Sequence, residues 1–350
     1  MKLGLVGFGV GGRSFHAPYI EAADGVELAG IVTRSRERRE MAAAEYPGVR
    51  LFESMGDLID SGGDAVVITT PPETRRQLVL EAIAAGVHVI ADKPFAPSAE
   101  VGLELVAAAE DAGVMLSVFH NRRWDTDIRT LRSVIDSGAL GEIARFESRF
   151  DQDQPESLTV GPAGGLLRDL GSHLVDQALW LFGPAATVYA SLDWANLPEG
   201  RTDSGFFVTI THQSGVRSHV SGNKTSHLDA RELRLLGSDG SYISEQNDVQ
   251  THDIFAGRRP VDDLASWGYE NEERWGTLAT ATGSVRVPSE QGAYHHYYEQ
   301  FALAVAGRGP QPVPALEGVR TLQVLDAARL SDAESRCVPI RESDLTILHP

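Results

Sequence analysis

The sequence has few of the residues that mark secreted, membrane-bound or fibrous proteins. Cys337 is the only cysteine in the chain, so no internal disulfide can form and we expect a reducing cytoplasm. It stands in a polar stretch without a motif, and we interpret the thiol as inert. No apolar run of about 18 residues occurs, and the first apolar run is too short and glycine-rich for a signal peptide, so we expect no membrane partner.

Positive charge is also scarce. Lys and Arg number 31 against 49 Asp and Glu, which gives a net charge of −18. This balance argues against nucleic acid or an anionic membrane as the main partner. Hydrophobic residues make up 42% and charged residues 23%, as in ordinary globular proteins. At about 150 residues per domain, the length of 350 residues predicts two domains.

Buried apolar strands alternate with helical patterns in the first 120 residues. The predicted strands are 3–6, 26–33, 65–69, 87–91 and 115–119, and the clearest helices are 74–85 and 99–112. Such alternation is typical of βαβ units around a parallel sheet. Residues 1–120 are therefore predicted to form an α/β domain with a doubly wound parallel sheet of the Rossmann type.

The pattern changes in residues 121–350. Hairpin turns at 214–215 and 238–240 separate strand-like segments, the clearest being 142–150, 205–212, 216–222 and 231–237. Helical patterns cover 125–137, 167–182, 294–305 and 315–331. We predict a second domain of the α+β class, built on a large, open and predominantly antiparallel sheet.

A glycine-rich loop follows the first predicted strand. Gly7, Gly9 and Gly12, with Phe8 and Val10 between them, match the pattern G-x-G-x-x-G. The first glycine permits a tight turn, the second lets a pyrophosphate approach the backbone and the third lets helix and strand pack closely. The alternative is a glycine-rich turn without a ligand.

The second predicted strand ends in Thr33, Arg34 and Ser35. An acidic residue at this point, roughly 20 residues beyond the loop, would hold the ribose 2′-hydroxyl of NAD, whereas a short hydroxyl and an arginine suit the 2′-phosphate of NADP. Arg36, Arg38 and Arg39 add positive charge in the same segment. We therefore favour NADP, with NAD as the alternative cofactor. The competing interpretation is a solvated helix start.

Two further motifs have the residue types of an active site. Lys93 and Pro94 follow a predicted parallel strand, at the sheet edge where ligands bind. Asp169 and His173 are four residues apart in a helical stretch and so share one face, with Asp176 on the same side. The alternatives are a surface lysine and a surface Asp–His pair. No third ligand has suitable spacing for a metal, so we expect none.

With these motifs, the chain resembles the family of glucose–fructose oxidoreductases, inositol dehydrogenases and rhizopine-catabolism proteins over essentially its whole length. The residues that carry the resemblance are the glycine loop, Asp92-Lys93-Pro94 and Asp169-Leu170-Gly171-Ser172-His173. Segments 120–125 and 164–167 look like those of NADP-dependent scyllo-inositol dehydrogenases. The chain departs from the family pattern in three places: Asp92 replaces Glu, Thr70-Pro71-Pro72 replaces Thr-Pro-Asn, and Arg75 replaces His.

The resemblance implies hydride transfer between a secondary alcohol and a nicotinamide, with the cofactor also touching Thr70, Pro71, Pro72, Asp92 and Lys93. A histidine side chain ordinarily titrates near neutrality, so His173 suits the role of proton acceptor. Lys93 would stabilise a developing alkoxide, and Asp169 would accept from a neighbouring hydroxyl. Whether Lys93 or His173 is the base stays open.

A polyhydroxyl substrate needs several polar contacts. Those predicted beside Lys93, Asp169 and His173 are Asn121, Arg122, Trp124 and Asp151, with Asp125, Gln152, His295 and His296 as weaker candidates. Trp124 either stacks on the substrate or packs between the domains.

The rival functions are an NAD-dependent redox glycosidase of the same family and a non-catalytic regulator that senses dinucleotides. The antiparallel sheet has an exposed face that should be covered, and in relatives this face forms dimers that pair into tetramers. The resemblance therefore implies that residues 121–350 bind substrate and support a homodimer or homotetramer.

Overall fold

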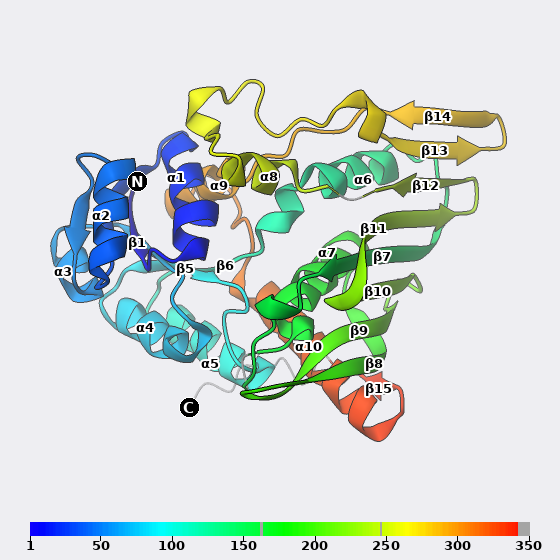
Figure 1. Ribbon diagram of the computed structural model, residues 1–350, viewed down its shortest axis with the longest axis horizontal. Coiled ribbons are helices and arrows are strands. Elements are labelled where there is room, and N and C mark those ends of the chain that lie inside the picture. Colours follow the sequence, from blue (N-terminus) through cyan, green and yellow to red (C-terminus); the bar gives the residue numbers. More distant parts are fainter. Residues whose placement is uncertain (162–163, 246, 342–350) are drawn as a thin grey trace.

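The computed structural model describes residues 1–161, 164–245 and 247–341. The chain forms two β-sheets, one from its first third and one from its remainder (Figure 1). In the described part of the chain, no helix is both long enough and apolar enough to cross a membrane.

The first sheet has six parallel strands in the order β3-β2-β1-β4-β5-β6. Their bounds are β1 (Lys2–Val6), β2 (Glu27–Val32), β3 (Arg50–Phe52), β4 (Ala65–Ile68), β5 (His88–Asp92) and β6 (Leu116–Phe119). Every residue of β4 and β6 is buried, because helices cover both faces of the sheet. The order reverses between β1 and β4, and this reversal creates the crevice at which such sheets bind ligands.

The helices of this part are short, and several of their starts are fixed by serine side chains. Ser35, Ser54 and Ser98 each accept a hydrogen bond from a backbone N–H of the helix that follows. The elements are η1 (Gly11–His16), α1 (Ala17–Ala22), α2 (Arg36–Glu45), α3 (Met55–Asp60), α4 (Pro72–Ala84) and α5 (Ala99–Asp111).

The second sheet has nine strands in the order β14-β13-β12-β11-β7-β10-β9-β8-β15. All neighbours are antiparallel except β7 and β10, so the sheet is mixed. The strands are β7 (Ile143–Asp153), β8 (Ala185–Leu197), β9 (Gly200–His212), β10 (Arg217–Asn223), β11 (Thr225–Gly237), β12 (Gly240–Ser244), β13 (Gly276–Thr280), β14 (Gly283–Val287) and β15 (Val338–Pro339).

Helices line the face of this sheet that points toward the first sheet (Figure 1). The helices of this part of the chain are η2 (Asn121–Trp124), α6 (Thr126–Asp136), η3 (Pro155–Ser157), η4 (Leu167–Gly171), α7 (Ser172–Phe182), α8 (Val249–Phe255), η5 (Pro260–Asp262), η6 (Glu272–Arg274), α9 (His295–Val305) and α10 (Ala315–Glu334). Of these, η5 and α9 pack against α1, and α8 packs against η1. Within the described ranges, the opposite face of the sheet carries no helix.

Helix α10 joins the two parts of the molecule. Its Asp326 accepts a hydrogen bond from the N–H of Ala99 at the start of α5, and its Ser331 accepts one from the N–H of Ala190 in β8. Just before α10, the carbonyl of Val313 accepts a bond from the N–H of Val118 in β6. The end of the chain therefore returns to the first sheet and fixes it relative to the second.

The predicted fold class is confirmed. The structure differs from the prediction in three places. The short edge strands β3 and β15 were not among the predicted strands. The helix expected over 167–182 begins with a π-helical turn, η4, before α7 continues as a regular helix. In addition, β13, β14 and α8 lie beyond the last strand that the hairpin pattern indicated.

Candidate active site

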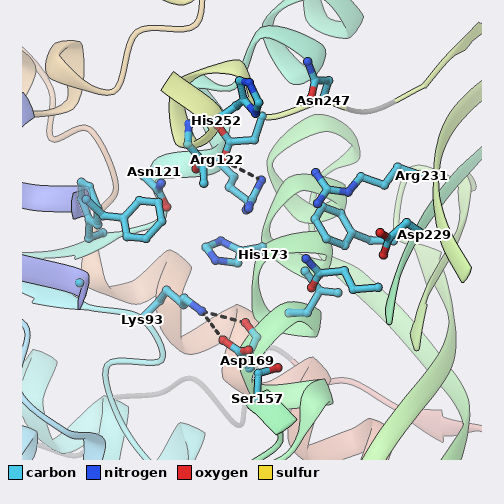
Figure 2. Close-up of a pocket in the computed structure, with 18 of the residues that line it drawn as sticks. Lys93, Asn121, Arg122, Ser157, Asp169, His173, Asp229, Arg231, Asn247 and His252 are labelled. Carbon is cyan, nitrogen blue, oxygen red and sulfur yellow. Dashed lines mark hydrogen bonds and ion pairs between the residues drawn. The ribbon is translucent and has the colours of Figure 1, made fainter. Parts of the chain in front are cut away.

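A cleft of about 1180 Å³ separates the carboxyl edge of the first sheet from the second sheet. The segments after β5 and β6 supply Lys93, Asn121 and Arg122, and the η4–α7 helix supplies Asp169 and His173 (Figure 2). The first three residues follow parallel strands, at the edge where open α/β sheets bind ligands, which explains why they converge.

The glycine loop has the conformation that a dinucleotide requires. Gly7 has a φ of +108°, a left-handed backbone conformation that favours glycine. A Cβ on Gly12 would lie 2.1 Å from the carbonyl oxygen of Gly7, so only glycine allows η1 to start this close to β1. Phe8, Gly9 and Val10 line a second cavity, of about 630 Å³, beside this turn. The loop therefore fits the pyrophosphate of a dinucleotide.

The arginines after β2 have different surroundings. Arg39 donates to the carbonyls of Thr33 and Phe52, which ties the ends of β2 and β3 together. Arg34 donates to the carbonyl of Glu53 and is otherwise exposed. The guanidinium of Arg38 lies over Gly9, where one of its nitrogens would be 3.9 Å from a Cβ on that glycine, and it lines the second cavity.

Ser35 uses its hydroxyl to cap α2. No carboxylate stands at the end of β2, where residues Thr33, Arg34 and Ser35 lie. Of the residues that follow β2, Arg38 lines the second cavity beside the glycine loop, together with Glu37, whereas Thr33, Arg34 and Ser35 lie outside its lining.

A buried arginine organises the two loops that flank Lys93. Arg75 donates to the carbonyls of Thr70, Asp92 and Pro94 at 2.8, 2.8 and 2.6 Å. The loop Thr70-Pro71-Pro72 and the Lys93-Pro94 turn are thus fixed to each other through one side chain. Arg75, the residue that stands where the family has His, therefore holds the cleft floor in place.

Asp92 is committed to local contacts. Its carboxylate accepts hydrogen bonds from the hydroxyl of Thr69 at 2.9 Å and from the N–H of Lys93 at 2.8 Å. Burial opposes its ionisation, but His16, Arg75 and Lys93 outweigh burial and lower the pKa of Asp92. Asp92 is therefore an ionised group that sets the direction in which the Lys93 side chain leaves the sheet.

Lys93, Asp169 and Lys224 form one charged cluster. Nζ of Lys93 donates to Oδ1 and to the backbone carbonyl of Asp169, each at 2.9 Å (Figure 2). Nζ of Lys224 lies 3.2 Å from Oδ2 of the same carboxylate. The charge of Lys93, aided by that of Lys224, lowers the pKa of Asp169 against the effect of burial. Asp169 is therefore an anion shared by two ammonium groups.

His173 projects from the first turn of α7 into the cleft (Figure 2). Its side chain is buried and Nδ1 has no hydrogen-bond partner among the described residues. Burial, and after it the positive charges of Lys93 and Arg122, lower the pKa of His173 well below its usual value. A neutral imidazole with a free ring nitrogen can accept a proton at neutral pH.

The other predicted contacts divide between the cleft and the core. Asn121, Arg122 and Gln152 line the cleft. Trp124 is buried with its ring centre 5.4 Å from that of Tyr297, which favours the packing interpretation over stacking on a substrate.

The remaining candidates have protein partners. Asp151 forms an ion pair with Arg149 at 3.0 Å. Asp176 accepts two hydrogen bonds from buried Arg123 and so faces away from the cleft. His295 and His296 lie against each other on α9, outside the cleft lining.

Lys224 and Arg231 are among the cationic residues near the cleft that were not singled out from the sequence. Lys224 is the first residue after β10, and Arg231 lies in β11. The sequence feature that could have indicated Lys224 is its position between two strand-like segments, β10 and β11. Arg231 was part of a predicted strand, but nothing in the sequence indicated that this strand faces the cleft.

This architecture defines a dinucleotide-dependent oxidoreductase with a Rossmann domain and a separate sheet domain. Residues 1–120 match the family model described as "Oxidoreductase family, NAD-binding Rossmann fold", and residues 128–243 match the "GFO/IDH/MocA C-terminal domain". The chain belongs to this Gfo/Idh/MocA family of oxidoreductases, and its first domain is an NAD-binding Rossmann domain.

Known relatives cover almost the whole chain. The chain is 32% identical to scyllo-inositol 2-dehydrogenase (NADP(+)) IolW of Bacillus subtilis, over 97% of this chain and 95% of that protein. It is 35% identical to the oxidoreductase YdgJ of Escherichia coli, over 93% and 94% of the two chains. A solved oxidoreductase from Yersinia pestis has 34% identity and a TM-score of 0.88, with 97% of both chains covered.

Proposed function

We propose that this protein is an NADP-dependent dehydrogenase that interconverts a secondary alcohol of a cyclitol or sugar and the corresponding ketone. The observation that carries the proposal is the convergence of Lys93, Asp169 and His173 in one cleft beside the glycine loop. The name of the Bacillus subtilis relative, a scyllo-inositol 2-dehydrogenase, supports the substrate class and the cofactor.

The three residues have distinct roles in this proposal. His173, neutral and with a free ring nitrogen, accepts the hydroxyl proton of the alcohol. Lys93 donates to the same oxygen and stabilises the charge that develops on it. Asp169 orients Lys93 and accepts from a neighbouring hydroxyl. The nicotinamide cofactor supplies the acceptor for the hydride that leaves the alcohol carbon.

The NADP preference rests on the segment after β2. Arg34 is exposed and Arg38 lies over Gly9, so both can meet a 2′-phosphate, which arginine binds with strong directional hydrogen bonds. Replacing either Arg34 or Arg38 by Asp should weaken NADPH binding at least about 10-fold more than NADH binding. Fluorescence titration measures both constants. Arg132→Asp is the control, because Arg132 pairs with Asp136 at the surface of α6, in the second domain. Equal loss of both cofactors would reject the assignment.

Turnover tests the reaction itself. The purified protein is screened with inositols, aldoses and their keto forms, each with NADP(H) and NAD(H), by nicotinamide absorbance. The proposal expects stoichiometric oxidation or reduction of at least one polyol pair. Hydrolysis of glycosides without net cofactor turnover would instead indicate the redox glycosidase. Cofactor binding without turnover of any polyol would indicate the regulator.

We also place the enzyme in the cytoplasm. Cys337 is a free, exposed thiol, and a reducing compartment keeps such a thiol from forming intermolecular disulfides.

A further inference from the structure

The wall of the cleft opposite Lys93 carries two arginines around one aromatic ring. The guanidinium of Arg231 in β11 stacks on the ring of Phe150 in β7 at 4.0 Å, and that of Arg122 lies 5.4 Å from the same ring centre. Figure 2 shows Arg122 and Arg231 on one side of the cleft and Lys93 with Asp169 on the other. One end of the cleft therefore contains Lys93 and Asp169, and the other end contains the two positive charges of Arg122 and Arg231.

The two arginines differ in how their charge is balanced. Arg122 has two carboxylate neighbours, Asp125 at 2.9 Å and Asp248 at 3.4 Å. The guanidinium of Arg231 has no hydrogen bond or ion pair within residues 1–161, 164–245 and 247–341. It lies on the face of Phe150, and this stacking leaves the N–H edge of the guanidinium unpaired among those residues.

Two other arginines that line the cleft, Arg149 and Arg75, have hydrogen-bond or ion-pair partners. Arg149 is paired with Asp151 at 3.0 Å, and Arg75 bonds three backbone carbonyls. Burial, and after it the positive charge of Arg122, lower the pKa of Arg231, although the nearby carboxylates of Asp248, Asp125 and Asp229 oppose this effect. A partly desolvated guanidinium beside a like charge, with carboxylates near it but none bonded to it among the described residues, gains from a ligand carboxylate that can bond its N–H edge directly.

We propose that Arg231, together with Arg122, binds a carboxylate of the substrate, so that the enzyme acts on a polyhydroxy acid such as an aldonate or uronate. This inference rests on the proposed dehydrogenase function and narrows its substrate class. The flat edge of a guanidinium matches the two oxygens of a carboxylate. Asp229 and Asp248 also line this part of the cleft, and their charges favour a singly charged carboxylate over a phosphate dianion.

The carboxylate takes no part in the redox step. Oxidation breaks the C–H bond of the carbinol, passes two electrons with that hydrogen to the nicotinamide cofactor, and releases the hydroxyl proton. The carboxylate is unchanged, and its role is to set which hydroxyl lies between Lys93 and His173. This role predicts specificity for position as well as for charge.

The test compares matched acids and neutral polyols: D-glucuronate with D-glucose, and D-gluconate with D-glucitol, with NADP+ as cofactor. The wild-type enzyme is expected to prefer an acid, and Arg231→Met is expected to lower kcat/KM for that acid about 100-fold through KM while neutral polyols change less than about twofold. Arg231→Lys should restore part of the loss. Calorimetric titration of the acid should show the same order of affinities.

Arg149→Met is the matched control, because it removes a cleft arginine that already has a carboxylate partner. Thermal melts and NADPH titration establish that each variant is folded. Two results overturn the subsite: equal use of acids and neutral polyols by the wild type, or equal loss for both in Arg231→Met. A preference for glucose 6-phosphate over both classes overturns the carboxylate assignment. Absence of turnover with every polyol would instead count against the dehydrogenase itself.

Discussion

The ammonium group of Lys93 donates two hydrogen bonds to Asp169, one to the carboxylate and one to the backbone carbonyl, each 2.9 Å long. These bonds join the carboxyl edge of the Rossmann sheet to η4, the π-helical turn that precedes α7 in the second domain. The Lys224 ammonium holds the other carboxylate oxygen at 3.2 Å. The position of Lys93 in the cleft therefore depends on two residues that are distant from it in sequence.

Replacing Lys224 by Met tests this dependence. We expect kcat to fall about 10- to 100-fold, because Asp169 loses one of its two charged partners and Lys93 is then less well oriented. In a double-mutant cycle with Asp169→Asn, the two losses should not add, since both act on one carboxylate. Steady-state kinetics measure the cycle. Lys2→Met, a change at an exposed surface lysine, is the control. Strictly additive losses would show that Lys224 acts independently of Asp169.

The lowered pKa of His173 predicts a characteristic pH profile. Its causes are burial first and then the charges of Lys93 and Arg122. If neutral His173 accepts the proton, alcohol oxidation should fall on acidification with an apparent pKa below the usual His value of about 6.5. His173→Ala should lower kcat about 10²- to 10⁴-fold and abolish that acid limb.

The pH dependence of kcat/KM checks this assignment. Asp125→Asn is the control, because Asp125, whose pKa is raised to about 7, is another group that could cause a pH dependence in this range. The control should keep the acid limb of the wild type. Near-full turnover by His173→Ala would remove His173 from the role of base and leave Lys93 as the candidate.

Asp125 itself predicts how stability changes with pH. Burial, and after it the charge of Asp248, raises its pKa to about 7, although Arg122 opposes this. The folded protein thus holds a proton that the unfolded chain releases near pH ~4. This contribution to stability is complete at low pH and is lost as pH rises through about 7.

The free energy of unfolding should therefore decline between about pH 4 and 7, by at most about 1.4 kcal/mol per pH unit from this one group. Asp125→Asn should make the decline shallower, since an amide does not titrate. Asp127, whose pKa burial also raises, keeps part of the slope in both proteins. Urea denaturation at several pH values measures how the free energy of unfolding changes with pH. An unchanged slope in Asp125→Asn would contradict the prediction.

Local patterns in the sequence were sufficient for the parts of the fold that depend on local physics. The alternation of apolar strands and helices predicted the first sheet, and Gly7 and Gly12 predicted its phosphate-binding turn. Strand polarity in the second sheet was less accessible, because the parallel pairing of β7 with β10 joins segments about 70 residues apart. The sequence of either segment alone does not indicate which strand it pairs with or in which direction.

The site shows the same division. Lys93, Asp169 and His173 were marked by a strand end and a helical spacing, and the structure brings them together. Arg231 and Lys224 were missed because their relevance depends on which face of the second sheet meets the first domain. The sequence left the role of Trp124 open, because an aromatic residue after a strand can either pack in the core or stack on a bound ligand. Only packing against Tyr297 separates the two.

The outer face of the second sheet leads to the last prediction, which concerns assembly. Tyr189 in β8, Phe207 in β9 and Ile243 in β12 are 47%, 49% and 43% exposed, whereas their neighbours Val188 and Val208 are buried on the other face. We propose that a second copy of the chain covers this face, since large apolar side chains on an open sheet mark an interface.

Light scattering at micromolar concentration should give a dimer or tetramer for the wild type. Phe207→Glu should shift the protein to monomers, because a charge buried in a self-complementary interface is repeated on both copies. Leu303→Glu places the same charge on an exposed position of α9 and should leave the assembly unchanged. A wild-type monomer would contradict the proposal. If Phe207→Glu stays oligomeric, the interface lies on another surface, because this one could not bury a charge at its centre.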